Sequence, residues 1–217
     1  MPEKNCSISV VIPAYFEEKT IAYVVDQCLP YVDEVLVVND GSTDDTSNNA
    51  RKAGARVIEF EKNMGVLNAI QRGLREASGD IVVTIDADGQ HDPSEIPKLT
   101  RPIIDGKSDL VMGKRPSFPH LSEKIITWLT SLNVPCTDVC TGFRAVKREI
   151  AEQMELHGTC LCGTFVLEGA RLGARVSCVP ISIRERNGTR RIQTQHVHQF
   201  LIVLKDVLRA RFDVLIG

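Results

Sequence analysis

The stretch "DIVVTIDADGQHDP" at residues 80–93 decides the fold of this chain. Its first half, 80–86, is a short run rich in β-branched residues, which favours a buried strand. Its second half is polar and places Asp86 and Asp88 on either side of a single alanine. A buried strand that ends in a carboxylate-rich loop is typical of α/β proteins, whose ligands bind beyond the carboxyl ends of the strands.

Strands and helices alternate on both sides of this stretch. Short apolar runs predict the strands, and apolar residues at three- and four-residue steps predict the helices between them. This alternation is typical of a mostly parallel sheet with helices on both faces, so we predict an α/β fold. The predicted strands cover residues 8–13, 33–40, 55–60, 80–86 and 108–114, and the predicted helices cover 18–30, 42–54, 65–79 and 93–106.

The second half of the chain is less regular. We expect a helix from about Ser122, a short strand and a helix start within 137–150, a helix over 163–173 and a strand from 174 to 186. The basic loop "RERNGTRR" that follows, with Arg184, Arg186, Arg190 and Arg191, is either a solvated turn or a clamp for phosphate.

The end of the chain predicts an amphipathic helix. Its apolar residues recur at three- and four-residue steps, so we expect one face to pack on the domain, with a membrane-surface role as the alternative. His196 and His198 at its start are interpreted as exposed bystanders. The apolar positions are Val197, Phe200, Leu201, Leu204, Val207, Leu208, Phe212 and Leu215.

Composition excludes several classes of protein. The 217 residues are 43% hydrophobic and 25% charged, which supports a packed core in one domain over residues 1–217. A formal net charge of −2 argues against a nucleic-acid-binding protein. The sequence shows no apolar leader and no run long enough to cross a bilayer. We therefore expect a cytoplasmic protein, in contact with the cytosolic membrane face at most peripherally.

The cysteines also fit a reducing compartment. There are seven, an odd number without framework spacing. The pairs Cys136/Cys140 and Cys160/Cys162 lack the usual CxxC spacing of zinc ligands. We expect buried free thiols rather than a metal site.

Polar residues follow three of the predicted strands. Tyr15 and Glu17 follow the first, Asp40 ends the second, and Asp86 and Asp88 end the fourth. Because the carboxyl ends of parallel strands meet at one edge of a sheet, we expect these side chains to converge.

The spacing of Asp86 and Asp88 favours a divalent cation. Two carboxylates this close repel each other unless a cation lies between them or one is protonated. Mg²⁺ and Mn²⁺ take oxygen ligands and keep positions for water or phosphate, and Gln90 or His91 would add a further ligand. A solvated turn is the alternative, but the position after a buried strand favours the metal.

Five segments resemble motifs of the family 2 glycosyltransferases. The metal loop, within 77–99, is similar to that of polyprenyl-phosphate sugar synthases of the dolichyl-phosphate mannose synthase type. The resemblance covers residues 8–192. Its segments are "VVIPAYFEE" (10–18), "VVNDGSTDDT" (37–46), "ASGDIVVTIDADGQHDPSEIPKL" (77–99), "TDVCTGFRAV" (137–146) and "FVLEGARLGARVSCVPISIRERNGTRR" (165–191).

The resemblance implies a GT-A-type fold and an inverting, metal-dependent transfer from a nucleoside-diphosphate sugar. By position, Asp86 would face the donor's ribose or sugar beside the cation. Asp88 and Gln90 would bind the cation, Mg²⁺ or Mn²⁺. The residues implied to contact the nucleotide are Pro13, Tyr15, Glu17 and Asp40, the last through the base.

The resemblance also bears on the acceptor. Arg115 would meet an acceptor phosphate. A lipid phosphate is already ionised near neutral pH and needs no general base, whereas an alcohol needs one. Asp138 is the candidate base, and it is the only acid in "TDVCTG", where related enzymes that act on hydroxyls often carry a pair. We therefore favour a hexose transfer, from a donor of the GDP-mannose or UDP-glucose type, to a polyprenyl (dolichyl-type) phosphate.

Departures from the family motifs keep alternatives open. Phe16 stands where Asn is usual, Asn39 where Asp is usual, and Val66 and Leu67 where Lys and Gly are frequent. One alternative is a transferase that acts on a sugar hydroxyl, and another is a degenerate module that binds a nucleotide sugar without turnover. A sugar nucleotidyltransferase is disfavoured, because "PAYFEE" is acidic where such enzymes carry a basic, glycine-rich loop.

The predicted organisation has three parts. Residues 1–114 would hold the nucleotide sugar and metal, residues 115–192 the acceptor, and residues 193–217 would form the C-terminal amphipathic helix.

Overall fold

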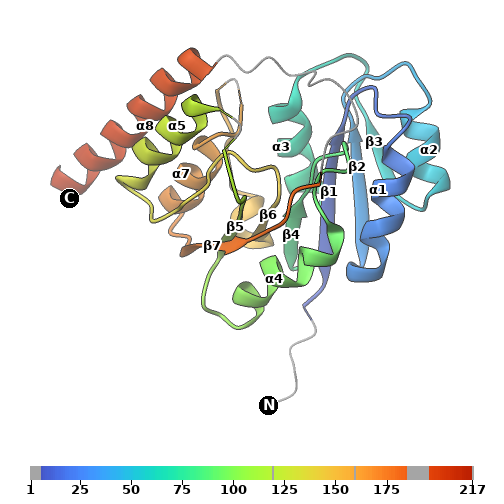
Figure 1. Ribbon diagram of the computed structural model, residues 1–217, viewed down its shortest axis with the longest axis horizontal. Coiled ribbons are helices and arrows are strands. Elements are labelled where there is room, and N and C mark those ends of the chain that lie inside the picture. Colours follow the sequence, from blue (N-terminus) through green and yellow to red (C-terminus); the bar gives the residue numbers. More distant parts are fainter. Residues whose placement is uncertain (1–5, 119, 159, 185–195, 217) are drawn as a thin grey trace.

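A computed structural model describes residues 6–118, 120–158, 160–184 and 196–216. These residues form one seven-stranded sheet with helices on both faces (Figure 1). The strands are β1 (Ile8–Ala14), β2 (Glu34–Asn39), β3 (Arg56–Glu59), β4 (Ile81–Thr84), β5 (Leu110–Lys114), β6 (Arg144–Lys147) and β7 (Val176–Pro180). The helices are α1 (Ile21–Cys28), α2 (Thr46–Lys52), α3 (Val66–Glu76), α4 (Ile96–Ile104), α5 (Leu121–Ser131), α6 (Arg148–Ala151), α7 (Thr164–Arg171) and α8 (His196–Ile216), with 3₁₀ turns at Leu29–Tyr31 and Pro93–Glu95.

The sheet is mostly parallel, as predicted. Its strand order is β3-β2-β1-β4-β6-β5-β7. Only β6 runs antiparallel among the described strands, and it lies between β4 and β5. The α/β class predicted from the sequence is confirmed. The insertion of β6 matters for the site, because it brings residues near 142 beside the end of β4.

Alternation along the central strands builds a core on each face of the sheet. In β1, Val10 and Ile12 face one cluster, and Val11 faces the other. The first cluster is covered by α1, α2 and α4, and the second by α3, α5, α7 and α8. Burial of both faces explains why the strands are continuous apolar runs in the sequence.

The predicted boundaries agree with the structure to within a few residues. The strand expected over 80–86 ends at Thr84, so Asp86 already lies in the loop beyond it. The strand expected from 174 to 186 is confined to Val176–Pro180 within the described residues. Several residues singled out from the sequence lie outside the described side chains: Arg186, Arg190, Arg191, His196, Val197, Phe212 and Leu215.

The buried face of α8 agrees only in part with the one expected. Val207 is buried, and Phe200 and Leu204 pack against the core, as predicted. Leu201 and Leu208 were expected to pack on the domain, but both are exposed. Gln199 and Val203 are fully buried instead. The Gln199 amide hydrogen-bonds the backbone at 160 and 162, accepting at 3.2 Å and donating at 2.8 Å, which fixes the rotation of the helix. A polar anchor therefore overrides the apolar pattern here.

Helices α5 and α8 lie side by side at one end of the molecule (Figure 1). Among the helices that the structure describes, none combines the length and apolar character needed to cross a bilayer.

Candidate active site

The polar residues predicted to converge do meet at one edge of the sheet. Strand β1 pairs with β2 on one side and β4 on the other, so the loops after all three strands are neighbours. Tyr15 and Glu17 follow β1, Asp40 follows β2, and Asp86 and Asp88 follow β4.

The loop predicted to bind the metal is held by two hydrogen bonds of the Gln90 backbone. The N–H of Gln90 donates to Oδ1 of Asp88 at 3.1 Å, which closes a tight turn around Gly89, at φ 74°. The carbonyl of Gln90 accepts the N–H of Arg184 at 2.8 Å. The loop is thereby attached to the chain that follows β7.

Arg184 supports the same loop with its side chain. Its guanidinium forms an ion pair with Asp92 at 2.8 Å and donates to the Tyr23 hydroxyl at 3.0 Å. Of the four arginines predicted to form a basic cluster, this is the one in the described part of the chain, and it contacts the metal loop.

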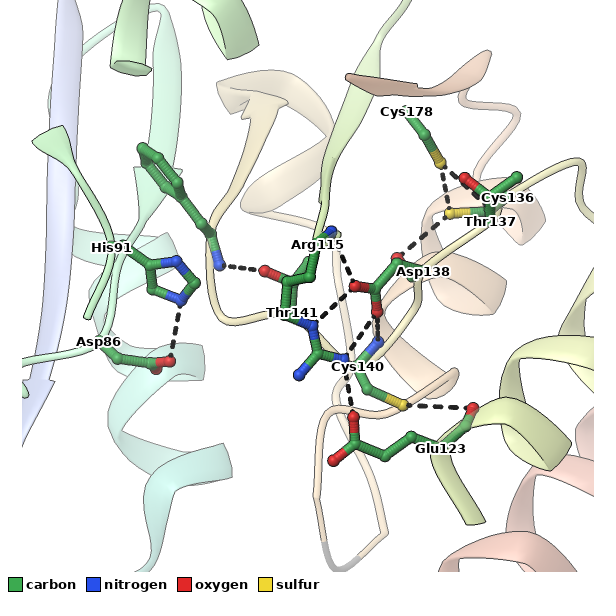
Figure 2. A network of polar contacts seen from close by, with 11 residues as sticks. Asp86, His91, Arg115, Glu123, Cys136, Thr137, Asp138, Cys140, Thr141 and Cys178 are labelled. Atoms are coloured by element: carbon green, nitrogen blue, oxygen red, sulfur yellow. Dashed lines mark hydrogen bonds and ion pairs between the residues drawn. The ribbon is translucent and has the colours of Figure 1, made fainter. Parts of the chain in front are cut away.

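Asp86 is held by basic groups (Figure 2). Nε2 of the buried His91 lies 3.4 Å from Oδ2 of Asp86, and the His91 ring packs on Phe143 with a centroid distance of 5.3 Å. Desolvation raises the pKa of Asp86, but His91, then Arg144 and Arg115, outweigh it and leave the pKa below its usual value. Asp86 therefore stays ionised at neutral pH. His91, considered above as a metal ligand, instead contacts Asp86.

Gly142 is packed directly against the Asp86 carboxylate. A Cβ atom at this position would overlap both oxygens of Asp86. The carbonyl of Gly142 accepts the Thr84 hydroxyl at 2.8 Å, which ties the end of β4 to the segment before β6. Only glycine at position 142 leaves room for the Asp86 carboxylate where it lies.

The donor set of the loop suits a hard cation. Asp86, Asp88 and Gln90 offer carboxylate and amide oxygens, the ligands that Mg²⁺ and Mn²⁺ prefer. No group of three or more His, Cys, Asp or Glu residues with metal-binding geometry occurs in the described residues. A carboxylate pair with one amide leaves the other coordination positions to water or a substrate phosphate.

Asp40 holds the loop between β3 and α3. Its buried carboxylate accepts the N–H groups of Met64 at 2.6 Å and Gly65 at 2.9 Å. Gly41, at φ 75°, leaves room for this loop, because a Cβ there would overlap the backbone of Lys62. Asp40 thus has a structural role in addition to its predicted contact with a base.

The loop after β1 carries an exposed aromatic ring and a carboxylate next to the start of α1. Pro13 is buried in β1, and Tyr15 is exposed, with its ring edge-on to Phe16 at a centroid distance of 4.5 Å. The Glu17 carboxylate accepts the Thr20 hydroxyl at 2.8 Å at the start of α1. The Glu17 side chain therefore contacts the residue that precedes α1 and, within the described range 6–118, makes no side-chain hydrogen bond that caps the helix.

Arg115 and Asp138, given separate roles above, form one buried cluster with Glu123 (Figure 2). Nε of Arg115 donates to Oδ2 of Asp138 at 2.7 Å, and Nη2 donates to Oδ1 at 2.9 Å. Nη2 also donates to Glu123 at 2.7 Å. Desolvation lowers the pKa of Arg115, but Asp138 and Glu123 raise it beyond its usual value. The cluster holds one positive and two negative groups.

Asp138 is saturated with hydrogen bonds. Besides the guanidinium, it accepts the backbone N–H of Arg115 at 3.1 Å and that of Cys140 at 3.1 Å. A carboxylate engaged in this way is poorly placed to take a proton from a substrate.

Two charged residues were not singled out from the sequence: one belongs to this cluster, and the other lies near it. Glu123 lies on the buried side of α5, where its spacing of three from the buried Ile126 was the available signal. Arg144 is fully buried over the Phe165 ring at 4.7 Å, and its Nε and Nη1 have no hydrogen-bond partner in the described part of the chain. Arg144 lay within the quoted "TDVCTGFRAV" segment, but nothing in the residue pattern distinguished it.

Comparison with known sequences finds relatives over most of the chain. The sequence profile of glycosyl transferase family 2 matches residues 9–154. A dolichol-phosphate mannosyltransferase of Pyrococcus furiosus is 33% identical over 172 residues, which is 69% of this chain and 49% of the relative. A UDP-N-acetylglucosamine–dolichyl-phosphate N-acetylglucosaminyltransferase of Methanococcus voltae is 30% identical over 211 residues, 80% of this chain and 84% of the relative.

Coverage differs among these relatives. The chain covers 49% of the Pyrococcus protein and 52% of a dodecaprenyl-phosphate galacturonate synthase of Rhizobium johnstonii. It therefore spans about half the length of these two relatives.

Solved structures give a second comparison. Glucosyl-3-phosphoglycerate synthase of Mycobacterium tuberculosis, in complex with phosphoglyceric acid, superposes with a TM-score of 0.78 at 29% identity, over 94% of this chain and 80% of that one. The same enzyme with Mn²⁺, UDP-glucose and phosphoglyceric acid gives a TM-score of 0.76 at 28% identity, over 95% and 80% of the two chains.

Proposed function

Because the chain belongs to glycosyl transferase family 2 and has a GT-A-like fold, we propose that it transfers a hexose from a nucleoside-diphosphate sugar to a polyprenyl phosphate. The observation that carries this proposal is the meeting of Tyr15, Asp40 and the Asp86–Gln90 loop at one sheet edge. The Mn²⁺ and UDP-glucose complexes of a structural relative support the donor class and the cation.

The donor half would comprise residues 1–114. Asp88 and Gln90 would hold Mg²⁺ or Mn²⁺, which supplies Lewis-acid stabilisation of the charge that develops on the leaving diphosphate. Asp86, kept ionised by its basic neighbours, would face the ribose or sugar. The exposed ring of Tyr15 offers a surface for the base, beside Asp40.

The acceptor half would comprise residues 115–192. The hydrogen bonds that saturate Asp138 argue against its use as a general base. An acceptor that is already ionised, such as a lipid phosphate, needs no such base. The names of the Pyrococcus and Methanococcus relatives point to the same acceptor class.

Arg115 would then act through the loop it holds. Its guanidinium is committed to Asp138 and Glu123, so it is an internal partner rather than a free cation for phosphate. We propose that it positions the 136–142 segment against the metal loop, and that the acceptor phosphate is met by other basic groups.

One face of α5 is suited to a lipid surface. Its large side chains are exposed and lie at helical spacing, on the side opposite the buried Glu123. Exposed Lys124 lies among them, and basic and aromatic residues are favoured at membrane interfaces. We propose that this face, with exposed residues of the adjacent α8, lies on the membrane that carries the acceptor. Its apolar members are Leu121, Ile125 and Trp128 of α5, Leu132 directly after that helix, and Leu201 and Leu208 of α8.

A second acceptor class has specific support. Glucosyl-3-phosphoglycerate synthase, the structural relative, was solved with phosphoglyceric acid bound. A small phosphorylated hydroxy acid is therefore the alternative acceptor. A module that binds a donor without turnover is the remaining alternative.

The test is sugar transfer into a product that extracts into organic solvent. The protein would be incubated with polyprenyl phosphate in detergent, Mn²⁺ or Mg²⁺, and labelled GDP- and UDP-sugars. We expect label from one donor in the organic phase, dependent on the metal. Asp88→Asn is expected to lower this transfer at least about 100-fold, whereas Asp26→Asn, at an exposed site on α1, should leave it unchanged.

Adding phosphoglycerate as a second acceptor in the same assay separates the proposals. Label in phosphoglycerate but not in lipid would select the alternative acceptor. Metal-dependent donor binding without any transfer would leave the binding module, and no donor binding at all would contradict a transferase.

A further inference from the structure

Two cysteines that are far apart in the sequence meet within residues 115–192, the part of the chain proposed to hold the acceptor. The Sγ atoms of Cys136 and Cys178 lie 2.8 Å apart, across a separation of 42 residues (Figure 2). Cys136 belongs to the loop after α5, and Cys178 belongs to β7. The pairs considered from spacing alone, 136/140 and 160/162, did not include this contact.

The two thiols have different surroundings. Cys136 is buried, and its S–H group lies 3.5 Å from the carbonyl of Asp138. Cys178 is half-buried on β7, the last strand in the sheet order, and its sulfur accepts the N–H of Thr137 at 3.3 Å. Cys178 is thus the more exposed residue of the pair.

The hydrogen bonds favour a thiolate at Cys178. The bond from Cys136 lowers the pKa of Cys178 below the usual value of a thiol, against the desolvation that raises it, and the N–H of Thr137 contributes. The same contact, with burial, raises the pKa of Cys136. A thiolate is the nucleophile in thiol–disulfide exchange, so Cys178 is the attacking group and Cys136 the second thiol.

We propose that Cys136 and Cys178 form a modification site that reacts with low-molecular-weight disulfides to give an intramolecular disulfide. The Cys178 thiolate attacks one sulfur of the external disulfide, whose S–S bond breaks and releases the first thiolate. Cys136 then gives its proton to that thiolate and attacks Cys178 of the mixed disulfide, releasing the second thiolate. The two cysteines are oxidised by two electrons, and the external disulfide is reduced to two thiols.

The two sulfur atoms need to move only a short distance to form the intramolecular disulfide. A disulfide bond measures about 2.05 Å, so the two sulfurs need to approach by less than about 1 Å. The new bond would join β7 to the 136–142 segment. That segment carries Asp138, the partner of Arg115, and Gly142, which packs on Asp86. The disulfide would therefore fix the 136–142 segment to β7 of the sheet.

The other cysteines of the described chain are less suited to this chemistry. Cys140 and Cys160 both contact Cys162, and these contacts, followed by desolvation, raise the pKa of Cys140 and Cys160. Burial raises the pKa of Cys28 to about 12. Cys178 differs from Cys28, Cys140 and Cys160 in having its pKa lowered.

The test uses oxidised glutathione on the reduced, folded protein. After reaction, free thiols are alkylated in denaturant, and tryptic peptides are analysed by mass spectrometry. We expect one disulfide-linked product, between the peptides that contain Cys136 and Cys178, with the loss of two hydrogen atoms. We also expect the melting temperature to rise by about 5 °C, and both changes to reverse with a dithiol reductant.

Variants distinguish the two roles. Cys136→Ser should accumulate a glutathione adduct at Cys178, because the second thiol is missing. Cys178→Ser should give neither the link nor an adduct at Cys136. Cys140→Ser is the matched control, since Cys140 shares a tryptic peptide with Cys136, and it should still form the link. The melting temperature of each reduced variant shows whether it is folded.

Two results would overturn the proposal. One is that Cys136 and Cys178 both remain fully alkylatable after the folded wild-type protein is exposed to the oxidant. The other is that the link appears equally in denatured protein and at random with other cysteines. Neither readout depends on sugar transfer, so failure here is independent of failure of the proposed function.

Discussion

Gly142 is the residue of the second half of the chain that packs against the Asp86 carboxylate. We predict that Gly142→Ala lowers metal-dependent sugar transfer at least about tenfold, because its Cβ would displace the Asp86 carboxylate. Transfer assays and titration of Mn²⁺ binding check this. The added methyl group acts on the partly exposed, ionised Asp86 carboxylate and not on the apolar core, so the loss should be larger in transfer than in stability.

Gly173→Ala is a matched control for this substitution. Gly173 has φ 83° and open space around its Cβ position. Alanine there should destabilise the fold by about 1 kcal/mol through backbone strain and leave transfer unchanged. Equal transfer by the Gly142 and Gly173 variants would show that Asp86 tolerates displacement.

Backbone conformation explains one departure from the family motif. Phe16 has φ 55°, a left-handed conformation that Asn tolerates far better than a bulky residue. The Asn usual at this position is therefore accounted for without any ligand contact. Asn39 is similar, because its oxygen accepts the N–H of Ser42 at 3.0 Å, as an Asp oxygen would.

The sequence predicted the residues that end strands better than those inside the core. Asp40, Asp86 and Asp88 were identifiable because a carboxylate after an apolar run is conspicuous. Arg144 and Glu123 were not, because their burial depends on partners from distant segments. Single positions in the sequence carry no signal of such contacts.

At the scale of elements, an ion cluster attaches α5 to the site. Arg115→Met would leave the buried carboxylates of Asp138 and Glu123 without their cation. We predict a loss of about 3 kcal/mol in the free energy of unfolding at neutral pH, measured by urea denaturation.

The control is Arg101→Met on α4. Arg101 pairs with Asp105 at 2.9 Å, but its side chain is largely exposed. An exposed pair of this kind contributes less than about 1 kcal/mol. Similar losses for both variants would mean that burial of the Arg115 cluster has no energetic effect.

Glu34 connects the amino ends of four neighbouring strands. Its carboxylate accepts from Ser9, Arg56 and Ser78, which belong to β1, β3 and the turn before β4. Desolvation raises its pKa, but these hydrogen bonds lower it from 4.5 to about 2. A lowered pKa means that the ionised form stabilises the fold above pH 4.5, and that this contribution is lost as the pH falls from 4.5 towards 2.

We therefore predict that Glu34→Gln lowers the free energy of unfolding by about 2 kcal/mol at pH 7 and by much less near pH 2. Denaturant titrations of both proteins between pH 2 and pH 7 give the difference. Glu152→Gln, which removes an exposed ion pair with Arg148 on the surface, should show little difference at any pH. If the difference in the free energy of unfolding between wild type and Glu34→Gln did not vary with pH, the stabilising role of the ionised Glu34 carboxylate would be contradicted.

Strand order was the part of the fold least accessible from the sequence. The alternation of elements up to residue 114 predicted a parallel sheet. The place of β6 between β4 and β5 depends on long-range pairing, such as Val83 with Ala145 and Val111 with Ala145. Apolar alternation specifies that a strand is buried, but not which strands flank it.

At the scale of the whole molecule, α5 separates the candidate site from the exposed apolar face. Glu123 on the inner side of α5 holds Arg115, while the outer side of the same helix is exposed and apolar. Rotation of α5 would expose Glu123 and bury its outer face, so the buried ion pair fixes which residues face outward. The exposed apolar face is therefore a consequence of how the site is built.

Trp128 lets membrane contact by this face be measured directly. It is the one tryptophan in the sequence, and it is 62% exposed. We predict that its emission shifts to shorter wavelength when phosphatidylcholine vesicles containing phosphatidylglycerol are added, because the ring moves from water into the interface. An unchanged spectrum at vesicle concentrations that sediment the protein would place the contact elsewhere.

A matched pair of substitutions locates the contact more sharply. Ile125 on α5 and Ile104 on α4 are similarly exposed, at 43% and 39%, but only Ile125 belongs to the proposed face. Because burial of an aliphatic side chain contributes about 1.5 kcal/mol or more, Ile125→Ser should weaken partition into vesicles about tenfold. Ile104→Ser should change it less than about twofold, since that side chain would remain in water. Equal effects would mean that the molecule binds lipid without a preferred orientation, and the acceptor would then have to reach the sheet edge from solution.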